Sequence, residues 1–281
     1  MTNQKLKTYN DINWAQLRAN ALEAKGWKDK GPGEWDKKAE SFAGRNKSAT
    51  YIDLFLAQLP LDPTMSVLDI GSGPGTLALP IAKRVKNVSA IDFSRGMLDT
   101  LKKFALAENI NNITCVQCAW EDDWSDKGLL PHDIAIASRS MGVKDLEPAL
   151  DKINSFAKQY VFLSDRIGAT PFDLGAFKAL DRPFTLGPDY IYTLNTLYTM
   201  GIHPNVTVLE LEPEVTYPSM DEAISSFSWM FHDITADELI ALKQYIQSKI
   251  VSSGSHEITI RKDSPPRWAL IWWKKSKRRI K

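Results

Sequence analysis

The residues Val67-Leu68-Asp69-Ile70-Gly71-Ser72-Gly73-Pro74-Gly75-Thr76 decide the fold that the sequence predicts. A short apolar run holds Asp69 near its end, three glycines follow at alternate positions, and a helical pattern continues to about Lys86. This order is typical of a strand, a tight turn and a helix N-terminus, the first half of a βαβ unit. Glycine lets a ligand approach the backbone, and the free N–H groups of the helix would point at that ligand.

A second strand follows the glycine loop and also ends in a carboxylate. Asn87 to Asp92 is a short apolar run, and Asp92 stands 21 residues after Gly71. A carboxylate at this spacing suits the two hydroxyls of a ribose. A nicotinamide dinucleotide would need a third glycine or alanine where this chain has Thr76, and Asp69 would repel its pyrophosphate. Asp69 would instead attract an α-ammonium group; the alternative to a ligand loop is an ordinary βα turn in another doubly wound protein.

Two motifs in register carry a family resemblance. Asp69-Ile70-Gly71-Ser72-Gly73-Pro74-Gly75 and Asp92-Phe93-Ser94-Arg95-Gly96-Met97-Leu98 resemble motifs of the class I S-adenosylmethionine (SAM)-dependent methyltransferase superfamily, over about residues 64–165. The resemblance implies an α/β fold: a doubly wound, mostly parallel seven-stranded sheet with helices on both faces, N-terminal helices and a helical lid. It also implies SAM as the cofactor, S-adenosylhomocysteine as the product, and in-line displacement of the sulfonium methyl. Such a reaction depends on alignment and exclusion of water more than on a strong base.

The resemblance also assigns residues to the cofactor. They are Asp69, Gly71, Ser72, Gly73, Gly75, Asp92, Phe93, Met97, Ala119, Trp120, Glu121 and Ser138. Met97 would lie against the adenine or, as an equal alternative, in the core. After the third strand the superfamily often has an acidic residue for the adenine amino group, whereas this chain has Ala119. Glu121 or Asp122 would take over that contact, with Trp120 stacked on the ring, unless the acidic residues form a solvated loop.

The methyl acceptor is expected at the end of the fourth strand, because ligands gather outside the carboxyl ends of parallel strands. That strand spans about His132 to Ser138. Neither an Asn/Asp-Pro-Pro-aromatic run nor a Pro-Cys nucleophile follows it, which argues against DNA amino and cytosine-C5 methyltransferases. The catalytic residue stays unknown, and the candidates by position alone are Arg139, Asp165, Arg166, Tyr190 and His203. For His203 an exposed turn is the favoured alternative.

The chain is expected to have three segments. They are an N-terminal helical segment (1–60), a SAM-binding core (61–167), and a C-terminal part of the sheet with a basic tail (168–281). Within the last, 168–203 and 213–266 are expected to pack together as a helical lid over the ends of strands four and five. The second insertion contains two predicted helix starts, at Ser219 and Thr235. The acceptor would then lie beside Ser138 and Arg139; a homodimer interface is the alternative role for these insertions.

Residues 11–59 predict three helices before the first strand. In the superfamily such helices often close over the cofactor, and the candidates for that role here are Trp35, Phe42 and Arg45. Packing against the sheet is the favoured alternative for the two aromatic residues.

Composition narrows the expected partners. The 281 residues carry a net charge of +1, with no membrane-spanning apolar run and no signal-peptide core, so we expect a cytoplasmic protein. Cys115 and Cys118 lie on opposite faces of a predicted strand, so no metal is expected. Six of the last eight residues are Lys or Arg. The aromatic-rich insertions favour a small-molecule acceptor over nucleic acid. The alternatives are an RNA methyltransferase that uses the basic tail, and a SAM-binding protein without turnover.

Overall fold

The computed structural model describes residues 8–26, 31–36, 39, 49–254 and 257–275. Phe42 and Arg45 of the predicted cofactor cover, and the basic tail beyond Lys275, lie outside the described residues. Of the predicted N-terminal helices the structure describes α1 (Trp14–Ala24), α2 (Pro32–Asp36) and α4 (Ala49–Leu56), after a short 3-10 helix at Tyr9–Asp11.

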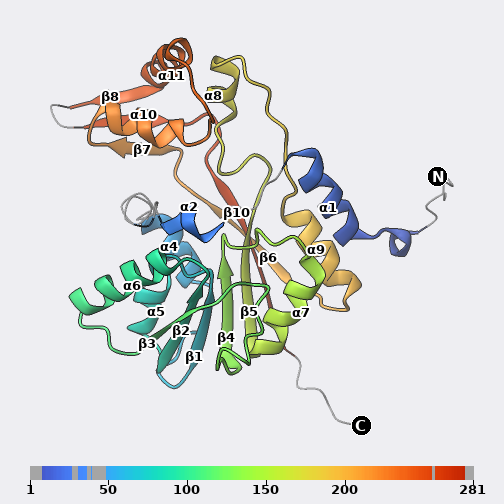
Figure 1. The fold of residues 1–281 in the computed structure, drawn as a ribbon. Helices are drawn as coiled ribbons and strands as arrows, with labels where there is room; N and C mark the ends of the chain where they lie inside the picture. Colours follow the sequence, from blue (N-terminus) through green and yellow to red (C-terminus); the bar gives the residue numbers. More distant parts are fainter. Residues whose placement is uncertain (1–7, 27–30, 37–38, 40–48, 255–256, 276–281) are drawn as a thin grey trace, which may run out of the picture. The chain divides into compact units, whose positions relative to one another are not determined.

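A seven-stranded sheet forms the centre of the fold, as the sequence predicts (Figure 1). Its strands, in spatial order, are β3 (Ile113–Gln117), β2 (Asn87–Asp92), β1 (Ser66–Ile70), β4 (His132–Ser138), β5 (Ala157–Arg166), β10 (Arg267–Lys274) and β6 (Asn205–Glu210). The first five are parallel to their neighbours. Register places Asp69 beside Ala90 of β2 and Ile136 of β4, and Ser138 beside Ser164 of β5. The carboxyl ends of β1, β2, β4 and β5 therefore meet at one edge, as the predicted site requires.

β10 runs against the direction of the other strands. Near its start, the Ile167 N–H donates to the Arg267 carbonyl oxygen, and just beyond its end the Lys275 N–H donates to the Gln159 carbonyl oxygen. Strand β6 begins beside the end of β10, where the Asn205 side chain donates to the Trp272 carbonyl oxygen at 3.4 Å. The start of β6 is therefore at the edge where β5 begins, opposite the carboxyl ends of the parallel strands.

Helices cover the sheet on both faces. α5 (Ala78–Ala82) and α6 (Arg95–Ala107) pack on β2, whereas α7 (Leu146–Phe156) packs on β4. α9 (Tyr190–Thr199) packs on α7, and α1 packs on α9. The helix expected from Thr76 to Lys86 is shorter than predicted, since turns replace both of its ends. At the first end, Pro80 has no N–H to donate to the carbonyl oxygen of Thr76.

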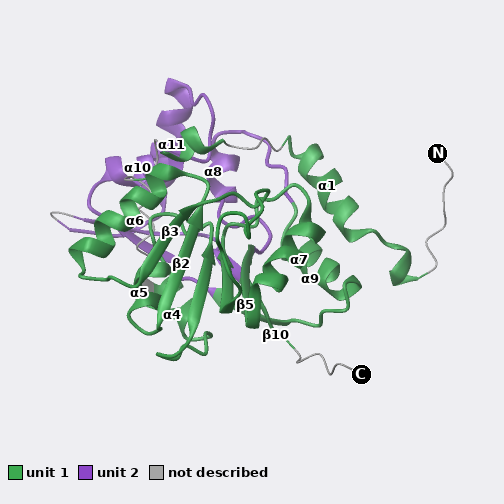
Figure 2. Cartoon of the chain, turned by 60° about the horizontal axis from the view of Figure 1, so that its bottom comes forward, with its two compact units in different colours: residues 1–165, 188–209, 269–281 green, residues 166–187, 210–268 purple. Residues whose placement is uncertain are grey.

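The chain divides into two compact units (Figure 2). Unit 1 comprises residues 1–165, 188–209 and 269–281, and unit 2 comprises 166–187 and 210–268. Unit 2 contains α8 (Leu174–Ala179), α10 (Met220–Ser228), α11 (Ala236–Ser248) and a three-stranded antiparallel sheet of β7 (Glu214–Tyr217), β9 (Ile258–Arg261) and β8 (Ile250–Ser253). The predicted insertion 168–203 is thus divided, since α8 belongs to unit 2 and α9 to unit 1.

The two predicted helix starts in the second insertion are present in unit 2. Ser219 accepts a bond from the Glu222 N–H at 3.2 Å, and Thr235 forms a reciprocal capping box with Glu238. The three strands of unit 2 were not predicted. Of the aromatic residues at the end of α10 and just after it, Phe227 and Phe231 are buried, but Trp229 is 48% exposed.

None of the helices in the described ranges has the length and apolar character needed to cross a bilayer. Cys115 is half-buried and Cys118 buried, and both are free thiols. Within the described parts of the chain, no group of three His, Cys, Asp or Glu side chains is arranged to hold a metal ion.

Candidate functional site

The three glycines after β1 have different surroundings, although all adopt positive φ (66°, 53° and 90° for Gly71, Gly73 and Gly75). A Cβ on Gly71 would lie 2.4 Å from the Cβ of Ser140, and one on Gly75 would lie 2.9 Å from the Leu101 side chain. A Cβ on Gly73 would meet no heavy atom within 4 Å. Gly71 and Gly75 are therefore required by the protein's own packing, whereas Gly73 leaves open the space that a ligand would occupy.

Asp92 joins the end of β2 to the glycine loop. Its two carboxylate oxygens accept bonds at 2.9 Å, one from the Gly73 N–H and the other from the Ser94 N–H. The side chain is 6% exposed, and burial raises the pKa of Asp92, opposed by these two bonds. A carboxylate has about four acceptor positions, so Asp92 keeps capacity for the hydroxyls of a ribose.

Asp69 is a buried carboxyl whose bonding is incomplete. It is 2% exposed, and it accepts the N–H of Ala78. Its Oδ2 and the neighbouring Ser72 hydroxyl have no hydrogen-bond partner among the described residues. Burial raises the pKa of Asp69 to about 7, with repulsion from Asp92 adding to the effect. A nearby cationic group would relieve this penalty, because an opposite charge favours the ionised carboxylate.

These features fit SAM. The open face at Gly73 gives room for a ligand against the backbone, Asp69 offers an unpaired oxygen to an ammonium group, and Asp92 offers acceptors to a ribose. The three groups come from β1, β2 and the loop after β1, at the edge where ligands bind in doubly wound sheets.

The N-terminus of α6 is bonded to α2. Ser94 caps the helix by accepting the Met97 N–H, and its hydroxyl donates to Asp36 at 2.5 Å. Asp36 also accepts the Gly96 N–H at 2.9 Å, and these bonds lower the pKa of Asp36. Met97 is 2% exposed on the buried face of α6, and Phe93 is half-buried. Burial of Met97 is compatible with both roles expected for it, and the cofactor contacts of Met97 and Phe93 stay predictions.

The predicted adenine loop after β3 is held by internal hydrogen bonds. Asp122 accepts the Ala119 N–H at 3.0 Å. This bond brings an acidic side chain to Ala119, the position where the superfamily often has an acidic residue of its own. The Trp120 indole N–H donates to the Ser140 carbonyl oxygen at 3.0 Å, so the partner that a half-buried indole needs is present. Glu121 is exposed. The adenine assignments of Ala119, Trp120 and Glu121 stay predictions.

A cluster of hydroxyls lies at the carboxyl ends of β4 and β5, where the acceptor was expected. The Tyr51 hydroxyl, from α4, lies 2.7 Å from the Ser138 hydroxyl and 2.7 Å from the Ser164 hydroxyl. Tyr51 is 1% exposed and Ser164 fully buried, and burial raises the pKa of Tyr51. Tyr51 is therefore protonated at neutral pH and acts as a hydrogen-bonding group, not as a base.

Arg139 borders this hydroxyl cluster in an unusual conformation. Its φ is 56°, a left-handed value that is uncommon for a non-glycine residue. Its N–H donates to the Ser164 hydroxyl at 2.9 Å, and its guanidinium carbon lies 4.3 Å from the centre of the Tyr51 ring. Burial lowers the pKa of Arg139, but a guanidinium stays charged at physiological pH. The cluster thus holds a fixed positive charge beside Ser138.

The remaining candidates are separated by the structure. Asp165 is the second-to-last residue of β5, and its Oδ2 accepts the Thr193 hydroxyl of α9 at 2.8 Å. Tyr190, the first residue of α9, is half-buried. His203 is exposed and precedes β6, so it lies at the edge opposite the carboxyl ends of β4 and β5. Arg139 therefore borders the hydroxyl cluster, the Asp165 side chain is bonded to α9, and His203 lies away from the expected acceptor position. The catalytic roles of these residues stay predictions.

Two residues of this region were missed from the sequence. Tyr51 appeared only as part of an apolar helical stripe, and Arg18 of α1 had no signal at all. Arg18 is 5% exposed and donates to the Met141 carbonyl oxygen at 2.8 Å and to the Val143 carbonyl oxygen at 2.6 Å. It thereby holds the loop that follows Arg139.

Comparisons with known proteins agree with this geometry. A family model described as a methyltransferase domain matches residues 67–159. An uncharacterized protein of Haemophilus influenzae is 34% identical over 272 residues, which are 95% of this chain and 98% of that protein. Two solved structures share the fold at 16% sequence identity: a candidate methyltransferase of Bacillus halodurans C-125 (TM-score 0.54) and the YcgJ protein of Bacillus subtilis (TM-score 0.53). In both comparisons the matched region covers 80% of this chain and 98% of the other chain.

Proposed function

Since the chain belongs to the class I SAM-dependent methyltransferase superfamily, we propose that it transfers the methyl group of SAM to a small-molecule acceptor at the carboxyl ends of β4 and β5. SAM is the cofactor of this superfamily, and S-adenosylhomocysteine is the product that remains after transfer. The proposal concerns the class of acceptor and the residues that receive it.

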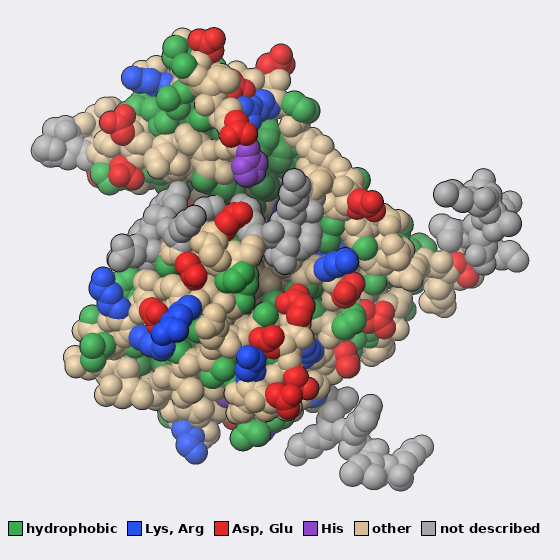
Figure 3. All heavy atoms as spheres, viewed as in Figure 1, with side chains coloured by type: hydrophobic (Ala, Val, Ile, Leu, Met, Phe, Trp, Pro, Cys, Tyr) green, Lys and Arg blue, Asp and Glu red, His purple; other side chains and the backbone are tan. Residues whose placement is uncertain are grey.

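The buried hydroxyl cluster carries the proposal. Tyr51, Ser138 and Ser164 form a connected set in which Tyr51 and Ser164 are almost fully withdrawn from the surface. A small polar group would meet the cluster at Ser138, its half-buried member, whereas a folded nucleic acid or protein would have to extrude the reacting group first. Figure 3 supports the same choice, since acidic and basic side chains are interspersed on the face that it shows.

The residues of the cluster suit a reaction governed by alignment. Tyr51 and Ser138 would orient a polar atom of the acceptor, and Arg139 would stabilise negative charge that develops on an acceptor oxygen as its proton leaves. We propose Asp165, which follows Ser164 on β5, as the group that receives that proton. An amine acceptor in its neutral form would need no base for the displacement itself.

A direct test uses the full-length protein with SAM that carries an isotopic label in its methyl group. Lysate is separated into a small-molecule filtrate, purified RNA and protein, and each fraction is offered as the acceptor source. We expect label in the filtrate, release of S-adenosylhomocysteine, and loss of both in an Asp92→Ala variant. Label in RNA or protein instead would contradict the proposal, and SAM binding without label in any fraction would indicate a non-catalytic role.

The basic tail gives a second arm to this test. Truncation should follow Lys275, because its ammonium donates to the carbonyl oxygens of Asn154 (2.6 Å) and Ala157 (2.5 Å) and the residue belongs to the fold. Removal of residues 276–281 should leave methyl transfer unchanged. If the truncated protein stays folded but loses transfer, and wild-type transfer falls steeply with salt, the RNA alternative gains support.

A further inference from the structure

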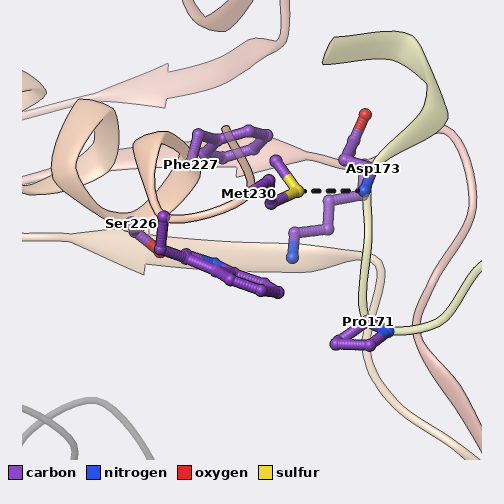
Figure 4. A pocket seen from close by; sticks show the side chains of 7 residues that line it. Pro171, Asp173, Ser226, Phe227 and Met230 are labelled. Carbon is purple, nitrogen blue, oxygen red and sulfur yellow. Dashed lines mark hydrogen bonds between the residues drawn. The ribbon is translucent and has the colours of Figure 1, made fainter. Parts of the chain in front are cut away.

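Unit 2 contains a small polar cavity with an aromatic border, separate from the residues considered above. The cavity has a volume of about 20 Å³, the room of one water-sized group. Figure 4 shows Ser226, Phe227 and Met230 on one side and Pro171 and Asp173, from the segment before α8, on the other. Lys262, just after β9, and Trp229 complete the lining.

Lys262 brings a positive charge that the surrounding protein compensates poorly. Among the described residues its ammonium group has no hydrogen-bond or ion-pair partner, and it lies 5.7 Å from the centre of the Phe227 ring. Lys249, in the same unit, shows the contrast: its ammonium bonds both carboxylate oxygens of Asp263, at 2.6 and 2.8 Å. Burial lowers the pKa of Lys262, and the nearby charge of Asp173 opposes that effect only in part.

Among the described residues, Asp173 forms no hydrogen bond or ion pair with Lys262, although both line the cavity. Its Oδ1 accepts the Tyr245 hydroxyl at 2.7 Å and the Ala176 N–H at 3.0 Å, which caps α8. The Ser226 hydroxyl lies 3.2 Å from the Tyr217 hydroxyl, so it can accept from Tyr217 and donate toward the cavity. The cavity therefore presents one ammonium and one hydroxyl as donors.

Trp229 supplies an apolar surface at the same place. Its side chain is 48% exposed, whereas Phe227 and Met230 near it in the sequence are buried. The centre of its ring lies 5.3 Å from the centre of the Phe172 ring. An exposed indole beside a half-buried cation is suited to a ligand with an apolar body and an anionic end. A monoanion suits the site better than a phosphate dianion, because Asp173 also lines the cavity and its repulsion grows with the charge of the ligand.

We propose that unit 2 binds small aromatic carboxylates, with the carboxylate bonded to Lys262 and Ser226 and the ring lying along Trp229. This site is independent of the methyl-transfer proposal, because every residue that forms it belongs to unit 2.

The test uses the full-length protein and benzoate as the probe, with benzamide as a neutral ligand of the same shape. Calorimetry and ligand-observed NMR should show that benzoate binds more tightly than benzamide. Lys262→Met should weaken benzoate binding about tenfold or more, because a charge-assisted bond is lost. Lys249→Met is the matched control and should leave benzoate binding unchanged. Thermal unfolding of both variants verifies that they fold.

A second measurement needs no variant. Acylation of wild-type lysines, followed by mass spectrometry, should show that benzoate protects Lys262 and leaves Lys249 unaffected. Equal binding of benzoate and benzamide, benzoate binding unchanged in Lys262→Met, or no protection of Lys262 would each overturn the proposed site.

Discussion

Replacement of Asp69 by Asn tests the central electrostatic feature of the site. Asp69 is fully enclosed, one of its oxygens lacks a partner, and burial raises its pKa from 3.8 to about 7. Asparagine keeps the shape and the acceptor for the Ala78 N–H but cannot ionise. The substitution therefore removes the titration of this side chain while leaving the loop in place.

The size of the effect follows from the pKa shift. In the unfolded chain the carboxyl is ionised above pH 3.8, whereas in the fold it holds its proton up to about pH 7. Stability from this group is therefore fully present below pH 3.8 and is lost as the pH rises through 7. Between pH 5 and pH 8 the stability that Asp69 contributes falls over the two pH units up to its pKa of about 7, which corresponds to about 3 kcal/mol at 1.36 kcal/mol per unit.

Urea unfolding at several pH values measures this contribution. Wild type should lose about 3 kcal/mol more than Asp69→Asn between pH 5 and pH 8, so the variant should become relatively more stable as the pH rises. The variant should bind SAM about tenfold more weakly at pH 8, because an amide cannot pair with an ammonium group. Wild-type binding should also release a proton near pH 7, detectable as a dependence of the calorimetric heat on buffer.

Parallel stability curves for the two proteins would refute the reasoning, since they would show that Asp69 is ionised in the fold throughout this range. Unchanged SAM affinity in the folded variant would separately remove Asp69 from the cofactor site.

Three further substitutions test other parts of the site. Gly73→Ala should cost about 1–2 kcal/mol of stability, because a side chain at positive φ is strained, and should weaken SAM binding at least tenfold. Gly71→Ala should destabilise the protein more, because its new side chain would clash with Ser140. Equal losses of stability in urea unfolding would contradict the separate roles of the two glycines. Asp92→Ala should weaken SAM binding by about 1–3 kcal/mol in calorimetry, and unchanged affinity would exclude the ribose contact. Arg18→Lys should lower stability by about 1–3 kcal/mol, because the single nitrogen of an ammonium cannot reproduce the fork by which two guanidinium nitrogens each bond a carbonyl oxygen of the loop after β4. An unaffected transition in urea would show that those bonds are dispensable.

The first half of the sheet could be predicted because its signals are local. β2 ends at Asp92 and β1 has Asp69 one residue before its end, both within a few positions of a turn, and Ser94 caps the helix that follows β2. Pairing of these strands follows from the βαβ connection. The strands of unit 2 lacked such signals: β8 and β9 have four residues each, and β9 pairs with β7, which lies about 40 residues earlier.

The hydroxyl cluster could not be predicted because its bonds join distant parts of the chain. Tyr51 lies 87 residues from Ser138 and 113 from Ser164, and Arg18 lies 125 residues from Val143. A tyrosine in an apolar helical stripe gives no sign that its hydroxyl will be buried against two serines. Only the fold brings α4 and the ends of β4 and β5 together.

The structure distinguishes the three glycines of the loop, which the sequence pattern alone does not. The G-x-G-x-G pattern presents three equivalent glycines, but two of them face the protein itself: Gly71 faces Ser140, and Gly75 faces Leu101. Ser140 in turn donates to the Ile70 carbonyl oxygen at 2.7 Å and accepts the Trp120 indole N–H. Gly71 is therefore part of the packing that joins the ends of β1 and β4 to the loop after β3. Of these three glycines, Gly73 alone has open space beside it and an N–H bonded to Asp92, so it is at Gly73 that a ligand could approach the backbone and the Asp92 carboxylate together.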